Sequence, residues 1–366
     1  MNLSHIPGHI LRRHTKRLVS PWLFQFGRVG RCLPPSNGCV IVTFHRVADA
    51  DTLGPFGHTV WGGSCATFAA TVAWLQERFH FITLDQLSAA VTDRHRLPPR
   101  ALLLTFDDGY RDVFLCAFPI LNRLNAPAAV FITTDVIDQT EQLLWMDKLS
   151  YAVWTTSRDA VEFQDLGEMP LAAEPLRRAA YGRISSRLKC MEASRRDREL
   201  DRLFATLNVT LPRRMAEALY LSSDEIRTMS QNGVVIGSHA CSHSMLSRLS
   251  RSEARREIVE SKTRLEAIVE SPVTAFAYPN GTAADFTDET VALLREAGFS
   301  LAMTTTPGVN RLDGAHDPFR LKRVHAGQNL SELQYFLGLT GVTERFSVRR
   351  SVSNGSNRPV TMDARP

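Results

Sequence analysis

The stretch of sequence that decides the fold is ALLLTFDDG, residues 101–109. Apolar residues, interrupted only by Thr105, lead directly into two adjacent aspartates, Asp107 and Asp108. Such a run is typical of a strand buried on both faces of a parallel sheet, and the carboxyl ends of these strands are where functional groups collect. The sequence therefore predicts two neighbouring carboxylates at the edge of a parallel sheet.

Other short apolar runs alternate along the chain with helical patterns. Strands are predicted at 39–44, 101–106, 128–133, 233–237 and 301–304, and helices at positions that include 112–124 and 251–269. A capping box, Ser250 followed by Glu253, marks the start of the second helix. The alternation predicts an α/β parallel sheet or barrel. Residues 140–222 break the rhythm, show no clear strand, and are predicted to form an inserted helical subdomain.

Composition and charge exclude some classes of protein. The chain has 366 residues, of which 44% are hydrophobic and 22% charged, as in ordinary globular proteins. Of the net charge of +5, residues 1–40 carry +6 and residues 341–366 carry +3, so residues 41–340 carry −4. A nucleic-acid-binding core should carry its own positive charge, so we expect no nucleic-acid partner.

The two ends are predicted to be extensions of a domain at residues 39–340. Residues 1–38 form a basic N-terminal extension, in which 9–26 mix basic and apolar residues and can lie on an anionic membrane surface. We favour the alternative that they pack on the domain or fray. Residues 341–366 have the polar composition of a disordered basic tail.

The expected location is the cytoplasm, with peripheral membrane contact as an open alternative. No apolar run is long enough for a transmembrane helix, and the N-terminus lacks the pattern of a secretory signal. The six cysteines are scattered without a CxxC pair, which favours free thiols in a reducing compartment.

A second motif follows the predicted strand at 233–237. His239 and His243 lie four residues apart, about one helical turn, so both rings can face one metal ion. Two histidines and one carboxylate form the ligand set of an open, catalytic metal site. Cys241 is a weaker candidate because residue i+2 points away from the side that i and i+4 share. The sequence lacks the His-Glu-x-x-His of zinc proteases, which disfavours that activity.

Together these motifs resemble the polysaccharide deacetylases with a NodB-homology domain, carbohydrate esterase family 4. The shared motifs are Thr-Phe-Asp-Asp-Gly at 105–109, Gly-Ser-His-x-x-x-His at 237–243 and Phe-Ala-Tyr-Pro-Asn-Gly at 276–281, with weaker similarity at 42–47 and 319–325. The third motif has the Phe-Ala-Tyr-Pro form of one branch of the family. The resemblance implies a distorted (β/α)7-type barrel and removal of acetyl groups from N-acetylated amino-sugar chains.

The resemblance also implies residue roles. Three residues would hold a divalent metal, usually zinc: Asp108, His239 and His243. Asp107 would be the general base, with metal-bound water as the nucleophile. Either His325 or His45 would supply a proton to the leaving amine, and we lean slightly to His325.

The third motif departs from the commoner family pattern at Ala277, where many members have an arginine that orients the base. Arg323 and Arg46 are the candidates to replace it. Asn280 is expected to offer its backbone N–H to the oxyanion, and Tyr278 to contact or orient the substrate. Trp145 and Asp147 could form a sugar-binding wall, although packing of the insertion is the favoured explanation for both.

Several other functions remain compatible with the sequence. The same chemistry would serve an O-acetyl esterase acting on xylan or another glycan. A glycan-binding barrel without catalytic turnover is a second alternative, and the replacement of the family arginine by Ala277 supports it. A protein with a purely structural metal site is a third, which would require only the metal-binding residues. A complete set of metal-binding residues together with a base favours an enzyme.

Overall fold

The computed structural model describes residues 38–57, 60–93, 95–312, 316–329, 331–334 and 337. The predictions for the basic extension, for membrane contact by residues 9–26 and for the tail at 341–366 lie outside these residues. Within the described part of the chain, no helix has both the length and the apolar composition of a membrane span.

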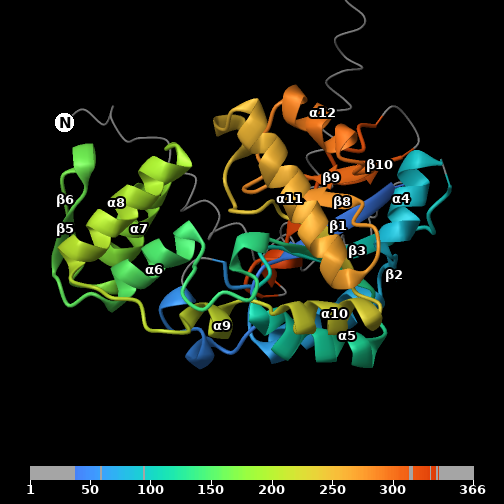
Figure 1. The fold of residues 1–366 in the computed structure, drawn as a ribbon. Helices are drawn as coiled ribbons and strands as arrows, with labels where there is room; N and C mark the ends of the chain where they lie inside the picture. The colour runs from blue at the N-terminus through green and yellow to red at the C-terminus, as the bar shows by residue number, and fades with distance from the viewer. Residues whose placement is uncertain are drawn as a thin grey trace, which may run out of the picture.

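A parallel sheet forms the centre of the protein (Figure 1). Its neighbouring strands are, in order, β1 (Gly38–Phe44), β3 (Ala101–Phe106), β4 (Ala128–Ile132), β7 (Val235–Ser238), β8 (Ala275–Ala277) and β9 (Leu301–Met303). β2 (His80–Phe81) pairs in parallel with β3, and β10 (Asn310–Arg311) pairs antiparallel with β1. Each strand predicted from an apolar run is present, with its ends shifted by no more than two residues.

The segment from Leu321 to His325 links the two ends of this sheet. Leu321 forms a parallel bridge with Met303 in β9, and β11 (Val324–His325) pairs in parallel with β1. The sheet is therefore curled, and the predicted distorted α/β barrel is confirmed. Arg323 lies in this segment, between the residue that pairs with β9 and the strand that pairs with β1.

Helices cover the outer face of the curled sheet. They are α3 (Cys65–Gln76), α5 (Phe118–Leu124), α10 (Ser223–Gln231), α11 (Arg251–Val269) and α12 (Asp288–Glu296). A π-helical turn, Val113–Ala117, precedes α5, and the capping box of Ser250 and Glu253 at the start of α11 is confirmed. Alternate strand residues fill the interior of the barrel, where α4 (Leu84–Thr92) adds Leu84 and Leu87. This alternation is what a sheet with apolar groups on both faces requires.

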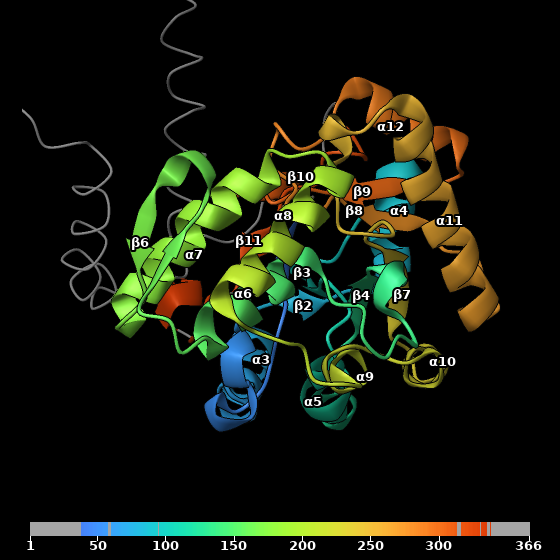
Figure 2. The same cartoon turned by 60° about the vertical axis from the view of Figure 1, so that its left-hand side comes forward.

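The segment between β4 and β7 builds a helical layer beside the sheet (Figures 1 and 2). It contains α6 (Trp145–Thr155), α7 (Glu174–Lys189), α8 (Ala193–Leu207) and α9 (Met215–Leu219), and α6 to α8 enclose a hydrophobic cluster of their own. The expectation that this segment lacks strands is wrong, because β5 (Ala160–Glu162) and β6 (Glu168–Pro170) form an antiparallel hairpin. Three-residue strands are too short to give a clear alternating pattern.

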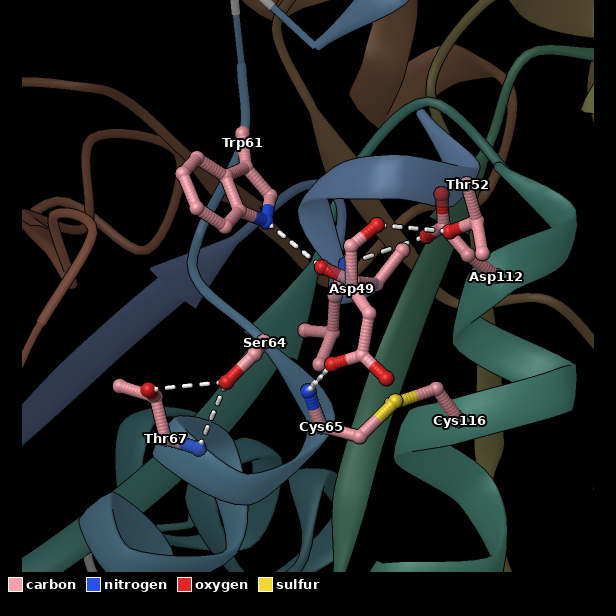
Figure 3. The surroundings of a disulfide bond; sticks show 10 residues. Asp49, Thr52, Trp61, Ser64, Cys65, Thr67, Asp112 and Cys116 are labelled. Carbon is pink, nitrogen blue, oxygen red and sulfur yellow. Dashed lines mark hydrogen bonds between the residues drawn. A yellow bond between two sulfur atoms is a disulfide. The ribbon is translucent and has the colours of Figure 1, made fainter. Parts of the chain in front are cut away.

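The prediction of free thiols is wrong for one pair of cysteines. Cys65, the first residue of α3, forms a disulfide with Cys116 in the π-helical turn (Figure 3). The pair is separated by 51 residues in sequence, but α3 and the π-helical turn follow β1 and β3, which are neighbours in the sheet. Disulfides persist mainly in oxidising compartments, so the cysteine argument for a reducing one no longer holds.

Candidate active site

Buried polar groups gather at the carboxyl ends of the parallel strands. Asp107 and Asp108 follow β3 and are each 1% exposed, and His239 follows β7 and is 2% exposed. His45 follows β1, and Asn280 lies beyond β8. A cavity of about 360 Å³ is lined by all five of these residues, which is within the range of small-ligand sites.

Asp108, His239 and His243 converge as a candidate metal centre. Each histidine places its Nε2 atom 3.3 Å from Oδ1 of Asp108, and the three ligand atoms lie within 4.8 Å of one another. His239 holds its ring by a 2.7 Å hydrogen bond between Nδ1 and the carbonyl oxygen of Ala277, which leaves Nε2 free to bind a cation.

The chemistry of this donor set fits a divalent metal ion. Both carboxylate oxygens of Asp108 are buried without a hydrogen-bond partner. Burial alone would raise the pKa of Asp108, but His239 and His243 outweigh it and hold the pKa well below its usual range. A buried, ionised carboxylate beside two imidazole nitrogens is the arrangement that a cation relieves, and two nitrogens with one oxygen are ligands that zinc accepts.

The backbone is unusual where it presents these ligands. Asp108 and Gly109 have φ values of 74° and 83°, and Ala240 and His243 have 64° and 57°. A side chain at Gly109 would place its Cβ atom 2.9 Å from Ile132, so the sharp turn after β3 requires glycine. Left-handed conformations at non-glycine residues cost energy and cluster at functional sites.

The expected helical turn between His239 and His243 is absent. This segment is a loop, and left-handed residues rather than a helical repeat direct the two rings to one point, 5.0 Å apart between centroids. The two histidine rings therefore converge as predicted, but the predicted reason, a helical turn, is wrong. Cys241, the weaker ligand candidate, donates its thiol to the carbonyl oxygen of Glu257 instead.

Glu257 on α11 holds this loop and was not identified from the sequence. Its Oε2 accepts hydrogen bonds from the backbone N–H groups of Cys241 (2.8 Å) and Ser242 (2.9 Å), and its Oε1 accepts one from the Ser242 hydroxyl (2.6 Å). The sequence signal was an acidic residue on the face of α11 that also buries Ala254 and Ile258. Buried carboxylates need partners of this kind.

We predict that Glu257→Ala will lower the free energy of unfolding by about 2–4 kcal/mol, because the buried N–H of Cys241 and the partly buried N–H of Ser242 lose their acceptor. Metal affinity should fall roughly 10- to 100-fold, since residues that orient ligands act on affinity to this extent. Chemical denaturation and metal titration measure the two effects. Glu260→Ala is the matched control on the exposed side of the same helix. Equal metal affinity in the two variants would contradict the assigned role.

Asp107 is held by Arg323 across 216 residues of sequence. Nη1 and Nη2 of Arg323 donate to the two carboxylate oxygens at 2.8 and 2.7 Å, and its Nε donates to the carbonyl oxygen of Thr304. Burial alone would raise the pKa of Asp107, but the guanidinium and His239 outweigh it and lower the pKa. Of the two arginines proposed to compensate for Ala277, Arg323 therefore contacts the carboxylate of Asp107.

Arg46, the other candidate, lies elsewhere in the site. Its Nε donates to Asp112 at 2.6 Å, and its guanidinium lies over the ring of Tyr110, 4.9 Å from the ring centroid. Asp112 also accepts the backbone N–H of Val47. Arg46 thus ties the loop after β1 to the turn after Asp108, and it forms no hydrogen bond or ion pair with Asp107.

Tyr278 and the Trp145–Asp147 pair belong largely to packing. Tyr278 borders the cavity, but its ring stacks on Phe286 and its hydroxyl donates to the carbonyl oxygen of Phe319. Trp145 borders the cavity and is 4% exposed. Asp147 accepts hydrogen bonds from two tyrosine hydroxyls, and its burial raises its pKa to about 6. The contacts of Asp147 agree with the packing role favoured for it. Trp145 packs in the hydrophobic cluster of α6 to α8 and also lines the cavity, so its part in sugar binding stays a prediction.

His45 and His325 form a pair, with ring centroids 5.6 Å apart. His45 lines the cavity, and its Nδ1 is buried without a partner. Nδ1 of His325 accepts the backbone N–H of Gly327 at 3.0 Å. Although part of His325 is exposed, burial of its ring and the neighbouring His45 and Arg323 lower its pKa to about 4. At neutral pH His325 is therefore uncharged.

Asn280 has a free donor at the edge of the cavity. Its backbone carbonyl oxygen accepts a hydrogen bond from the Thr305 hydroxyl at 2.6 Å, whereas its buried side-chain Nδ2 has no partner. Its backbone N–H donates to no described residue, and its φ of 59° again shows a left-handed turn.

The fold and the site define a class: an α/β barrel with a candidate metal centre and a second, ion-paired carboxylate at the carboxyl edge of its strands. Comparison with known proteins supports this class. The sequence profile of the polysaccharide deacetylase family matches residues 94–163 and 199–302. The chain belongs to the polysaccharide deacetylase family, as the motifs indicated.

Individual relatives are distant. The Bacillus subtilis protein YxkH is 19% identical over 265 residues, or 72% of this chain and 65% of its own length. The poly-beta-1,6-N-acetyl-D-glucosamine N-deacetylase of Escherichia coli is 32% identical over 95 residues, which are 26% of this chain and 14% of that protein. The chain thus spans less than two thirds of the length of these curated relatives.

Solved structures share the fold. The Streptococcus pyogenes deacetylase PplD, solved in complex with acetate, superposes with a TM-score of 0.54 at 16% identity, covering 83% of this chain and 99% of that one. IcaB from Ammonifex degensii gives a TM-score of 0.50 at 17% identity, covering 82% of this chain and 97% of the other.

Proposed function

We propose that this protein removes acetyl groups from the nitrogen of N-acetylated amino-sugar oligo- or polysaccharides. The observation that carries the proposal is the pair of adjacent buried carboxylates with different partners: Asp108 faces two imidazoles, and Asp107 faces Arg323. Similarity to the E. coli N-deacetylase, together with the −4 charge of residues 41–340, supports a glycan substrate rather than a nucleic acid.

The metal would be held by Asp108, His239 and His243, and zinc is our proposal for its identity. A bound divalent ion would polarise the acetyl carbonyl and acidify a water molecule. Asp107, kept ionised by Arg323, accepts the proton of the attacking water. Because each carboxylate oxygen retains a lone pair beyond its Arg323 contact, the ion pair does not block this step.

Two further residues complete the proposed reaction. The unbonded backbone N–H of Asn280 donates a hydrogen bond to the developing oxyanion. We propose that His45 delivers the proton to the leaving nitrogen. This replaces the slight preference for His325 that came from the sequence. His45 lines the cavity, whereas His325 lies beside it with a pKa of about 4 and holds no extra proton at neutral pH.

We predict that His45→Ala will lower kcat about 10²- to 10⁴-fold, the usual contribution of a general acid, and that His325→Ala will lower it less. Steady-state release of acetate from N-acetylchitotetraose, with the metal content of each variant recorded, measures both. A larger loss in His325→Ala than in His45→Ala would reverse the assignment.

The function itself is tested by acetate release from N-acetylchitotetraose and from acetylated xylan. Faster release from the N-acetylated substrate supports the proposal. Faster release from xylan would show that the protein is an O-acetyl esterase. If the metal-loaded protein released acetate from neither substrate, the alternative of a non-catalytic glycan-binding barrel would be favoured.

A further inference from the structure

The helical layer between β4 and β7 supplies one wall of the active-site cavity. Tyr181, Ser185 and Lys189 of α7 line this cavity together with Asp107 and the metal-binding residues. Their spacing of four residues places them on one side of the helix. The adjacent side of α7 buries Ile184 and Leu188 in the core of the helical layer, which fixes the orientation of the helix toward the cavity.

Lys189 brings an uncompensated charge to this wall. It is half-buried, and it makes no ion pair with any residue in the part of the chain that the structure describes. Arg187, two residues earlier, pairs with Asp165. Among the described residues that line the cavity, Asp107 and Asp108 are the acids; Asp107 is paired with Arg323, and Asp108 faces the two histidines.

A second buried cation contacts another residue of the cavity lining, Trp145. The guanidinium of Arg196 on α8 lies over the ring of Trp145, 5.3 Å from its centroid, and Trp145 lines the cavity. Arg196 is 5% exposed, its Nη2 donates to Ser244, and its buried Nε has no partner. Among the described residues no carboxylate is within ion-pair distance of Arg196, and Asp197, Glu257 and Glu192 act on its charge only from farther away. A cation this deeply buried without an ion-pair contact is unusual.

We propose that Lys189 binds an anionic group of the substrate, a carboxylate or a phosphate carried next to the N-acetylated sugar. This inference rests on the proposed deacetylase function and specifies its substrate class. Tyr181 and Ser185 offer hydroxyl groups to the sugar on the same side of α7, while the anion compensates the charge of Lys189. An ammonium group on a half-buried wall forms a charge-assisted hydrogen bond, which is stronger than a neutral one.

The test compares kcat/KM for three probes on the full-length protein. N-acetylchitotetraose is neutral, a hyaluronan tetrasaccharide carries carboxylates beside N-acetylglucosamine, and N-acetylglucosamine 1-phosphate carries a phosphate. Lys189→Gln removes the charge and Lys189→Arg keeps it. Arg183→Gln is the matched control, since Arg183 is exposed on α7, outside the cavity lining, and donates to the carbonyl oxygen of Leu166.

The wild type should prefer one anionic probe over the neutral one, and Lys189→Gln should lower that preference about tenfold, mainly through KM. The preference should persist in Lys189→Arg and Arg183→Gln and weaken as salt is added. No anionic preference in the wild type, or an unchanged preference in Lys189→Gln, would overturn the inference and leave the deacetylase function standing. Failure to release acetate from any probe would overturn both.

Discussion

Asp107→Asn is expected to lower kcat for acetate release by about 10²- to 10⁴-fold, the contribution of a well-placed general base. Asparagine has nearly the same shape but accepts no proton at neutral pH. The proposed metal-binding residues are untouched by this change, so metal content should stay at the wild-type value. Stopped assays of acetate, together with metal analysis of the same sample, measure the two quantities. A variant that retains the full rate would remove Asp107 from its assigned role.

The single change also leaves Arg323 buried without its partner. Breaking a buried ion pair on one side typically costs about 3–5 kcal/mol, so part of any loss in Asp107→Asn could come from unfolding. Asp107→Asn combined with Arg323→Met separates the effects, because it removes both charges. The double variant should recover most of the free energy of unfolding but none of the activity. Recovery of activity would show that the single variant had lost its fold and not its base.

Arg323→Met is expected to have the second large effect, a loss of at least about 100-fold in kcat at neutral pH. Without the guanidinium, burial dominates and raises the pKa of Asp107, so that the carboxyl holds a proton and cannot accept another. Arg323→Lys, which restores one charge but not the paired contact, should lie between this variant and the wild type.

The lowered pKa of Asp107 also fixes how stability and kcat should change with pH. In the wild type, the pKa of Asp107 lies below its usual value of about 3.9. The ion pair therefore stabilises the fold above that pH, and the stabilisation is lost as the pH falls through the lower native pKa. In Arg323→Met the rate should rise with pH as the proton leaves Asp107. A pH–rate profile of kcat that matches the wild type would contradict the role of Arg323.

Local patterns were enough to predict the sheet and the three residues of the candidate metal centre. Continuous apolar runs can form only where both faces are covered, so strands such as 101–106 were identified with their ends nearly correct. Asp108, His239 and His243 were found because the two aspartates follow one strand of this kind and the two histidines follow another. The helical explanation for the histidine spacing was wrong, since left-handed residues in a loop replace the helical turn.

Contacts between distant segments were harder to predict. Arg323 could only be named as a candidate, because its approach to Asp107 depends on how Leu321–His325 links the two ends of the sheet. The Cys65–Cys116 bond depends likewise on the pairing of β1 with β3. Lys189 gave a signal that was not used: with Tyr181 and Ser185 it forms a polar row at four-residue spacing, beside the row of Ala180, Ile184 and Leu188 that the helix buries.

The most direct test of the central claim is acetate release from N-acetylchitotetraose before and after removal of metal. The wild type should contain about one divalent metal ion per chain. It should lose its activity when a chelator removes the metal and regain it when zinc is added back. His239→Ala should neither retain the ion nor respond to zinc. Full turnover by stripped wild-type protein with no measurable metal would contradict the assignment of Asp108, His239 and His243 as the metal centre on which the reaction depends.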